Sequence, residues 1–267
     1  MTSIARRALT IVRQGADTAE CRAVGHAAML LDLSCKTVAV EQLADYAAAL
    51  RSGAALPVGS VEFVRAAMDV AGVREPDWSH YPKQLDWMLR REVRLSTAGR
   101  VLGRFFVKPV KTKLWNGFVF DTMGDPDLLD QHDREQYDAF MAVDPDEPVW
   151  TSEPTRFLCE WRHYVCRGKF MGSTRYDPDG AEDAPLPDLT DIDEALRCMV
   201  EVCGPEITCA LDVGVIEGGE TALVEATDGW AIGLYSGALK STQYLDVLAT
   251  RWEQIIGTAG ADGGAPC

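Results

Sequence analysis

Two runs of sequence decide the fold: Leu211-Asp212-Val213-Gly214-Val215, and Leu223-Val224-Glu225-Ala226-Thr227-Asp228-Gly229-Trp230 after the turn Glu217-Gly218-Gly219. Both runs have the apolar, β-branched composition of strands, and the glycine pair between them is typical of a turn. We therefore predict two strands, 209–215 and 221–226, flanking that turn.

Each of these strands carries an acid inside an apolar segment. Asp212 lies in the first strand, Glu225 lies in the second, and Asp228 follows at its end. A lone acid in a strand is more often an edge or turn residue, and Asp228-Gly229 also fits a turn. Carboxylates delivered from adjacent strands, however, form a hard-oxygen site of the kind that Mg²⁺ accepts, usually together with phosphate oxygens.

Upstream, a lysine also lies inside an apolar strand. Lys108 lies within the apolar strand 103–110, and the loop 111–117 adds Lys111 and Lys113 beside Gly117. Burying an ammonium group is costly unless an anion meets it. Phosphate oxygens fit a strand lysine next to a lysine- and glycine-containing loop. The alternative is a structural pair between Lys108 and a neighbouring acid.

The strand 156–165 places further charges on one face. Alternation puts Glu160 and Arg162 on the same side, opposite Trp161 and His163. The pair fits a solvated face with a cross-strand ion pair, whereas His163 fits a structural role in the core. Since acids, lysines and arginines recur in several apolar β segments, we interpret the set as a nucleotide and Mg²⁺ site.

Composition limits the possible partners. The 267 residues include 41 acids and 26 bases, a net charge of −15, which argues against a broad basic surface for nucleic acid. The longest apolar stretch, near 23–33, is interrupted and shorter than a membrane span. Arg13 ends the first apolar run too early for a signal peptide, and the eight cysteines form no CxxC pair. We expect a cytoplasmic protein with no membrane partner.

The predicted secondary structure changes near residue 101, which divides the chain into an N-terminal domain, 1–100, and a β-rich domain, 101–256. The first hundred residues look mostly helical or α/β, with one helix capped by Ser60. The β-rich domain contains a helix with Asp191 as its expected N-cap and closes with a helix over 242–256. The Gly/Ala-rich tail, 257–267, is expected to be disordered.

These motifs occur in a recognisable order. The run Phe106-Val107-Lys108-Pro109, then Ser152-Glu153 and Glu160-Trp161-Arg162, then the 211–215 and 223–230 runs resemble the ordered motifs of ATP-grasp proteins. The similarity is greatest to the ATP-grasp clade named for two arginines and a lysine, and it extends upstream to the 57–63 run and Tyr81-Pro82. It covers about Val38 to Ile256. The resemblance implies an α+β ATP-grasp fold, with two subdomains gripping ATP after a smaller N-terminal domain.

The resemblance also implies the residues that bind ATP. Lys108 would hold the α- and β-phosphates, and Lys113 is the expected contact from the loop above them. Ser152 and Glu153 would belong to the hinge whose backbone contacts adenine, and Glu160 would bind the ribose.

The remaining positions would carry the chemistry. Arg162 and Arg175 would be the two arginines of the clade, facing the γ-phosphate and the acyl phosphate, and they would act with Lys108 as catalytic residues. Asp212 and Glu225 would hold Mg²⁺, with two ions expected. The usual metal-binding Asn is Thr227 here, so Asp228 is the nearest replacement ligand.

The activity implied is ATP-dependent ligation of a carboxylate to an amine through an acyl phosphate, releasing ADP and phosphate. The substrates would be small molecules or peptides. Two alternatives are a small-molecule kinase that uses the same ATP site and an ATP-binding module that no longer turns over.

Two places are candidates for binding the substrate carboxylate. Gly59-Ser60, at the start of a helix, offers backbone N–H groups and a helix dipole that favour an anion. The alternatives are three arginines, Arg90, Arg91 and Arg94. All of these residues also fit ordinary capping and solvated roles.

Overall fold

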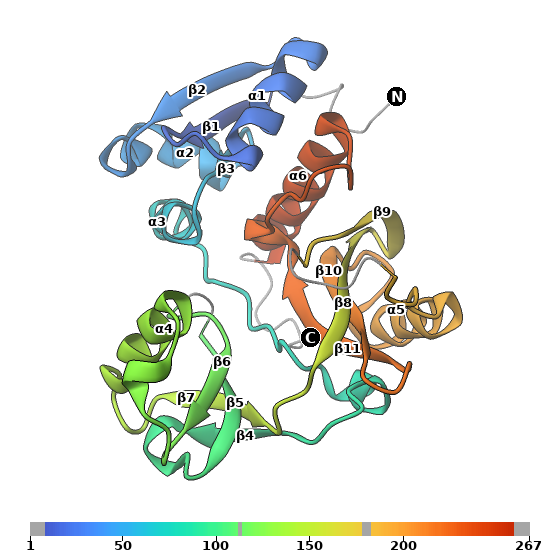
Figure 1. Cartoon of the computed structure of the whole chain (residues 1–267). Helices are drawn as coiled ribbons and strands as arrows, with labels where there is room; N and C mark the ends of the chain where they lie inside the picture. The colour runs from blue at the N-terminus through green and yellow to red at the C-terminus, as the bar shows by residue number, and fades with distance from the viewer. Residues whose placement is uncertain (1–8, 112–113, 178–182, 259–267) are drawn as a thin grey trace.

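The computed structural model describes residues 9–111, 114–177 and 183–258. In this part of the chain three β-sheets form, and Figure 1 shows each of them with helices beside it. Of the helices described, none is long and apolar enough to cross a membrane.

The N-terminal unit is a small α/β layer. Its parallel sheet has the order β2-β1-β3, from β1 (Thr10–Gln14), β2 (Ser34–Val38) and β3 (Ala55–Val58). The helical elements are α1 (Ala19–Leu31), η2 (Val40–Tyr46), α2 (Ala47–Arg51) and α3 (Val61–Ala71). Ser60 caps α3 as predicted, since its side chain accepts from Phe63 N–H. The three strands were not predicted, because their short sequences show no alternation of buried and exposed positions.

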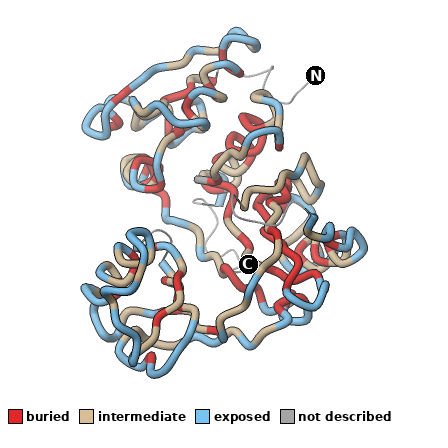
Figure 2. Tube along the Cα trace, viewed as in Figure 1, coloured by how far each residue is buried: buried red, intermediate tan, exposed pale blue. Residues whose placement is uncertain are grey.

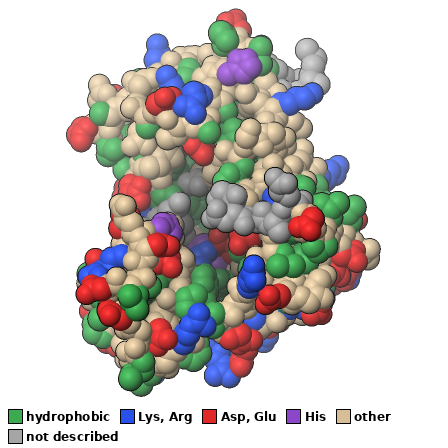
Figure 3. Space-filling view, in the orientation of Figure 1, with side chains coloured by type: hydrophobic (Ala, Val, Ile, Leu, Met, Phe, Trp, Pro, Cys, Tyr) green, Lys and Arg blue, Asp and Glu red, His purple; other side chains and the backbone are tan. Residues whose placement is uncertain are grey.

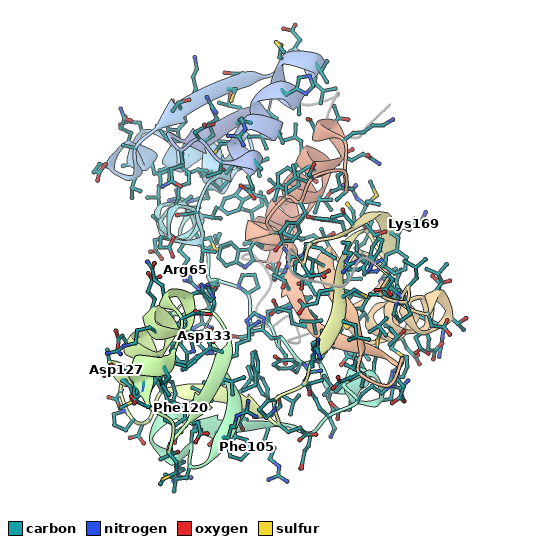
Figure 4. All side chains as sticks on the ribbon, viewed as in Figure 1. Arg65, Phe105, Phe120, Asp127, Asp133 and Lys169 are labelled. Atoms are coloured by element: carbon teal, nitrogen blue, oxygen red, sulfur yellow. The ribbon has the colours of Figure 1, made fainter. Side chains whose placement is uncertain are left out.

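The second sheet is antiparallel, with the order β4-β7-β5-β6. Its strands are β4 (Val93–Thr97), β5 (Arg104–Pro109), β6 (Phe118–Asp121) and β7 (Pro148–Ser152), with the short helices η4 (Ala98–Arg100) and η5 (Pro126–Leu128). The helix α4 (Gln131–Met141) packs on it through Phe140, which contacts the ring of Phe120, a residue labelled in Figure 4. β4 lies ahead of residue 101, so this sheet begins inside the range assigned to the N-terminal domain from the sequence.

The third sheet is also antiparallel, with the order β11-β10-β8-β9. It contains β8 (Phe157–Cys166), β9 (Lys169–Arg175), β10 (Cys209–Ile216) and β11 (Thr221–Asp228), followed by η6 (Gly229–Ala231). The helices α5 (Leu189–Cys203) and η3 (Lys83–Met88) share a core with one face of this sheet. Strands 209–215 and 221–226 are therefore confirmed as an antiparallel pair.

The start of α5 corrects the expected N-cap. Asp188, not Asp191, caps the helix, because its carboxylate accepts from Thr190 N–H at 2.7 Å. The helix therefore begins near the proline of the preceding connector, and Asp191 lies inside its first turn.

The N-terminal unit and the third sheet share one core through the closing helix, α6 (Ser241–Thr258). Tyr244 and Trp252 of α6 join the same buried cluster as Ile11 of β1 and Tyr164 of β8. The Tyr164 hydroxyl donates to Gly233 C=O at 2.7 Å and accepts from Tyr235 N–H at 3.0 Å. Figure 2 shows the buried positions concentrated along β8, β10 and α6. The segment after β11 is thus held against β8.

His163 lies on the core side of β8, as the alternation predicted. Its ring packs edge-on against Phe170 at 5.7 Å, and the residue is buried. Burial lowers the pKa of His163 from 6.5 to about 4, because the imidazolium form is poorly solvated there. The folded chain therefore binds fewer protons at this site than the unfolded chain between these two values.

We predict that acidification destabilises the fold through His163. Lowering the pH from 7 to 5 should reduce the free energy of unfolding by about 2 kcal/mol at this site, because the unfolded state takes up the proton first. Urea unfolding of wild type and His163→Gln at both pH values measures the difference. The exposed His132→Gln is the matched control. Equal pH dependence in all three proteins would contradict the prediction.

Candidate functional site

A cavity of about 770 Å³ lies between the second and third sheets. Lys108 of β5 lines one side of it, and Glu160, Arg162 and Glu225 of the third sheet line the other. Figure 3 shows the hollow on this face of the molecule, between the β4–β7 sheet with α4 and the rest of the chain. Residues from three of the predicted motifs therefore meet in one cavity.

A buried ion pair links two neighbouring strands of the third sheet beside this cavity. Arg162 and Asp212 are directly opposite each other on β8 and β10. Arg162 Nε lies 2.7 Å from Asp212 Oδ1, and Nη2 lies 2.5 Å from Oδ2. Burial would lower the pKa of Arg162, but the facing carboxylate outweighs it and raises that pKa. Arg162 is thus a fixed, permanently charged group.

Two stacked tyrosines cover the guanidinium. The rings of Tyr176 and Tyr235 are 4.7 Å apart and inclined by only 8°. Arg162 Cζ lies 5.8 Å from the first ring centroid and 5.0 Å from the second, within cation–π range. These contacts, with Asp212, fix the direction in which Arg162 presents its remaining N–H groups.

Lys108 meets a carboxylate across the cavity. Its ammonium forms an ion pair with Glu225, and Glu225 Oε2 also lies 3.2 Å from His80 Nδ1. Burial, followed by the charge of Lys108, lowers the pKa of His80 from 6.5 to about 3, so this imidazole is neutral at neutral pH. The pairing of Lys108 with a neighbouring acid is therefore present, and that acid is itself a predicted metal ligand.

Glu160 is held in place by Tyr176. The Tyr176 hydroxyl donates to Glu160 Oε2 at 2.6 Å, and Glu160 N–H donates to Asp177 Oδ1 at 2.8 Å. Burial raises the pKa of Glu160, although the hydrogen bond from Tyr176 opposes this shift. Glu160 therefore lines the cavity with its carboxylate held in one orientation.

The predicted hinge joins the two sheets. Residues 153–156 have no regular structure and connect β7 to β8. Ser152 is buried and lines the cavity, with its hydroxyl donating to Glu153 C=O at 3.0 Å. Glu153 is exposed and is not among the described lining residues, so its contact with adenine stays a prediction.

Besides Asp212, three predicted site residues are not placed at the cavity as the family resemblance implied. Arg175 pairs with Asp177, with two contacts of 2.8 Å, and does not line the cavity. Asp228 lies at the cavity wall, but its carboxylate is engaged by Arg251 of α6, whose Nε lies 2.6 Å from Oδ1. Lys113 lies outside the described residues.

Glu225 and Thr227 are the cavity residues whose oxygens could contribute to Mg²⁺ binding. Asp212 lies directly opposite Glu225 on β10, but it is not among the described lining residues and both of its oxygens are bound by Arg162. Thr227, two residues after Glu225, lines the cavity, and its buried Oγ1 has no hydrogen-bond partner in the described part of the chain. No group of three His, Cys, Asp or Glu side chains able to hold a metal occurs among the described residues. This set suits Mg²⁺, which usually takes one or two carboxylates and completes its shell with phosphates and water.

Sequence reasoning missed several cavity residues. His80, Tyr176 and Tyr235 carry no motif, and only the folded chain brings them beside Glu225 and Arg162. Arg91, a candidate for the substrate carboxylate, already donates to the backbone: its Nη1 donates to Leu223 C=O at 2.7 Å and its Nη2 to Val224 C=O at 3.2 Å.

The other carboxylate candidate lies elsewhere. Gly59 and Ser60 line a separate cavity of about 370 Å³ between the N-terminal unit and the segment after β11. Ser60 N–H already donates to Gln14 Oε1 at 2.8 Å, and Phe63 N–H donates to Ser60 Oγ. The helix start is therefore largely satisfied within the chain.

Several solved structures share this architecture. D-alanine–D-alanine ligase from Bacillus anthracis superposes with a TM-score of 0.50 at 12% identity, over 95% of this chain and 100% of that chain. D-cycloserine synthetase DcsG gives 0.54 at 12% identity, over 91% and 99%. N5-carboxyaminoimidazole synthase from Aspergillus clavatus, in complex with ADP and 5-aminoimidazole ribonucleotide, gives 0.52 at 12% identity, over 90% and 77%. At this identity the likeness shows the fold alone.

The family comparison goes further. A search of curated protein sequences finds no match. Residues 88–247 match the model of an ATP-grasp domain, family 2 of the clade named for two arginines and a lysine, and this range is more than half of the chain. It contains the second sheet, the hinge and the whole third sheet up to the start of α6. The chain therefore has the ATP-grasp fold and belongs to family 2 of this two-arginine, one-lysine clade of ATP-grasp proteins.

Proposed function

We propose that this protein is an ATP-dependent carboxylate–amine ligase. The observation that carries the proposal is the cavity between the two sheets, where Lys108, Arg162 and Glu225 converge from separate strands. Phosphoryl transfer depends mainly on positioning and charge, so a site built from fixed cations and carboxylates is sufficient for it. Members of the family are ATP-dependent ligases, and the ligases found by structural comparison share the fold.

The reaction has two steps. A carboxylate oxygen of the substrate attacks the γ-phosphorus of ATP, the bond to the β–γ bridging oxygen breaks, and ADP leaves an acyl phosphate. An uncharged amine then attacks the acyl carbon, the bond from carbon to the phosphate oxygen breaks, and the nitrogen proton goes to the departing phosphate. The products are an amide, ADP and inorganic phosphate.

The cations of the chain have distinct tasks in this proposal. Lys108, now paired with Glu225, would exchange that partner for the α- and β-phosphates. Arg162, fixed by Asp212 and the tyrosine pair, would hold the transferring phosphoryl group. Arg175 stays a prediction from the family resemblance, since it contacts Asp177 in this structure.

Mg²⁺ would be held by Glu225, with Thr227 Oγ1 as the further protein donor. Asp212 stays a prediction from the family resemblance, since both of its carboxylate oxygens are bound by Arg162 in this structure. When bound, Mg²⁺ would neutralise phosphate charge and polarise the γ-phosphoryl group. Thr227 points to the same face of β11 as Glu225, because residues two apart share a face of a strand. Asp228 lies on the other face and is bound to Arg251, so we assign it a structural role.

Hydroxylamine distinguishes ligation from kinase activity. It traps an acyl phosphate as a hydroxamate and does not react with a phosphate ester. With ATP, Mg²⁺ and a panel of candidate carboxylates, we expect hydroxamate in proportion to ADP. If ADP appears without hydroxamate or amide, the ligase proposal fails and transfer to a hydroxyl is favoured. Tight binding of Mg-ATP with no turnover for any acceptor would favour a binding module.

Lys108→Met should weaken binding of a non-hydrolysable ATP analogue about 30- to 100-fold, because a charge-assisted contact of roughly 2–3 kcal/mol is lost. Isothermal titration calorimetry measures this change. Lys169→Met is the matched control, since Lys169 lies exposed at the start of β9, away from the cavity (Figure 4). Equal loss in both variants, or none in either, would contradict the assignment.

Two variants distinguish the proposed metal-binding role of Thr227 from the proposed structural role of Asp228. Thr227→Val keeps the shape and removes the hydroxyl, so we expect the Mg²⁺ concentration for half-maximal activity to rise about 3- to 10-fold, equivalent to roughly 1 kcal/mol. Asp228→Asn should instead reduce the free energy of unfolding by about 1–3 kcal/mol, because it weakens a buried pair with Arg251. The reverse pattern would make Asp228 the metal ligand.

A further inference from the structure

The register of the third sheet gives the cavity of about 770 Å³ a direction. β8 begins next to the hinge, and β11 runs parallel to β8 because both strands are antiparallel to β10. Glu160 comes first along this direction. Arg162 and Glu225 follow, since both lie opposite Asp212 of β10, and Thr227 is two residues further along β11. The end of β11 therefore lies at the end of the cavity that is opposite to the hinge.

The proposed reaction needs its substrate carboxylate at that end. With the ribose at Glu160 and the transferring phosphoryl group at Arg162, ADP departs toward the hinge. The attacking and leaving oxygens of a phosphoryl transfer lie roughly in line. The carboxylate must therefore approach the γ-phosphorus from the side that faces away from the hinge, where Thr227 and the residues after β11 lie.

Two tryptophans line the cavity at this end. Trp78 and Trp230 occur there with Val61 and Pro76, and we call these four residues the distal wall. Trp78 lies beside the end of β11, since its Nε1–H donates to Ala226 C=O at 3.0 Å. Trp230 follows β11 directly, within η6. The distal wall is therefore apolar and largely aromatic.

The chain holds the indole of Trp230 in place. Trp230 is only 7% exposed, and Arg65 of α3, labelled in Figure 4, has its Cζ 5.8 Å from the Trp230 ring centroid. Arg65 is held in turn by Glu75, with Nε 2.7 Å from Oε2. A Cβ on Gly229 would lie 2.8 Å from the backbone oxygen of Thr208, so glycine lets the chain ahead of Trp230 pass close to it. These contacts position the ring without a substrate.

The same segment reaches Arg162. Asp212 engages Nε and Nη2 of Arg162. Nη1 lies beside Gly233, where a Cβ would be 3.7 Å from it. Gly233 lines the cavity and follows Trp230 by three residues. A carboxylate that attacks a phosphoryl group held at Nη1 would therefore place its carbon chain near the distal wall.

Charge around the distal wall disfavours a second carboxylate on the substrate. The acids Glu75 and Asp77 are exposed and line the cavity here. Among the described lining residues, no Lys or Arg comes from residues 61, 75–78 or 227–235. The lysines and arginines that do line the cavity are Arg91, Lys108, Lys111 and Arg162. This end therefore offers carbon surface to an acid and no described cation beyond Arg162.

We propose that Trp78 and Trp230 bind the acyl group of the substrate, and that this substrate is a monocarboxylic acid with an aromatic ring a few bonds from its carboxylate. The inference rests on the proposed ligase function and names its acid. An aromatic ring packed against an indole gains free energy in addition to the area that it buries. The distal wall would thus select the acid by its ring, while Arg162 and the nucleotide receive its carboxylate.

Binding of three simple acids tests the proposal without turnover. The full chain is saturated with Mg²⁺ and a non-hydrolysable ATP analogue, so that the nucleotide site is occupied, and is titrated calorimetrically with 3-phenylpropionate, propionate or glutarate. We expect 3-phenylpropionate to bind about tenfold or more tightly than propionate, because its ring leaves water. Glutarate should bind no more tightly than propionate.

Variants of the two tryptophans locate the binding site. Trp230→Leu and Trp78→Leu should each weaken binding of 3-phenylpropionate about fivefold or more and change that of propionate less than about twofold. A merely structural role would weaken both acids alike. Should Trp230→Leu not fold, Trp78→Leu decides the question. The matched control is Trp87→Leu, since Trp87 is exposed on η3 and is not among the described lining residues.

Four results would overturn the proposal. They are equal affinity for 3-phenylpropionate and propionate, tighter binding of glutarate, no binding of any of the three acids, and an equal loss of both monocarboxylates in the two tryptophan variants. An effect of Trp87→Leu as large as that of Trp78→Leu would also contradict the assignment.

The outcome separates this inference from the proposed function. If 3-phenylpropionate binds through Trp78 and Trp230 but hydroxylamine traps no hydroxamate from it or from any other acid, the acyl site stands and the ligase function fails. If hydroxamate forms from other acids and the phenyl ring brings no advantage, the ligase function stands and this inference fails.

Discussion

The buried pair between Arg162 and Asp212 is the constraint on which the site depends. Two charges on adjacent strands are almost fully removed from water, and each is tolerated only because the other faces it at hydrogen-bond distance. The pair fixes where Arg162 directs its outer N–H groups, and the tyrosine pair above it limits their direction further. Loss of either partner would leave an unpaired charge in the core, so the geometry of the site and the stability of the sheet are linked.

The same charge compensation occurs across the cavity between the second and third sheets. Lys108 reaches Glu225 from the opposite sheet, so an ion pair joins the two sheets. In the proposed reaction, exchange of Glu225 for phosphate at Lys108 would release a carboxylate for a metal ion. Four irregular residues, 153–156, connect the two sheets along the chain.

The two cavities differ in the charged residues that line them. The larger cavity presents lysine and arginine side chains beside glutamates, whereas the smaller one presents only glutamates among its described charged residues. Gly233 lines both cavities, and its carbonyl accepts from the Tyr164 hydroxyl at 2.7 Å.

The sequence by itself determined the β-rich domain and the residues of its motifs, because charges inside apolar runs leave a clear pattern, above all in the strands of seven to ten residues that form the third sheet. It predicted that Glu160 and Arg162 share a face, which the cavity confirms. Only the tertiary structure decided the partners. Asp228 meets Arg251, which is distant in sequence, Arg175 turns to Asp177, and His80 reaches Glu225 from a loop. Short parallel strands of the N-terminal unit left no periodic signal, so the sheet that they form was visible only once the chain had folded.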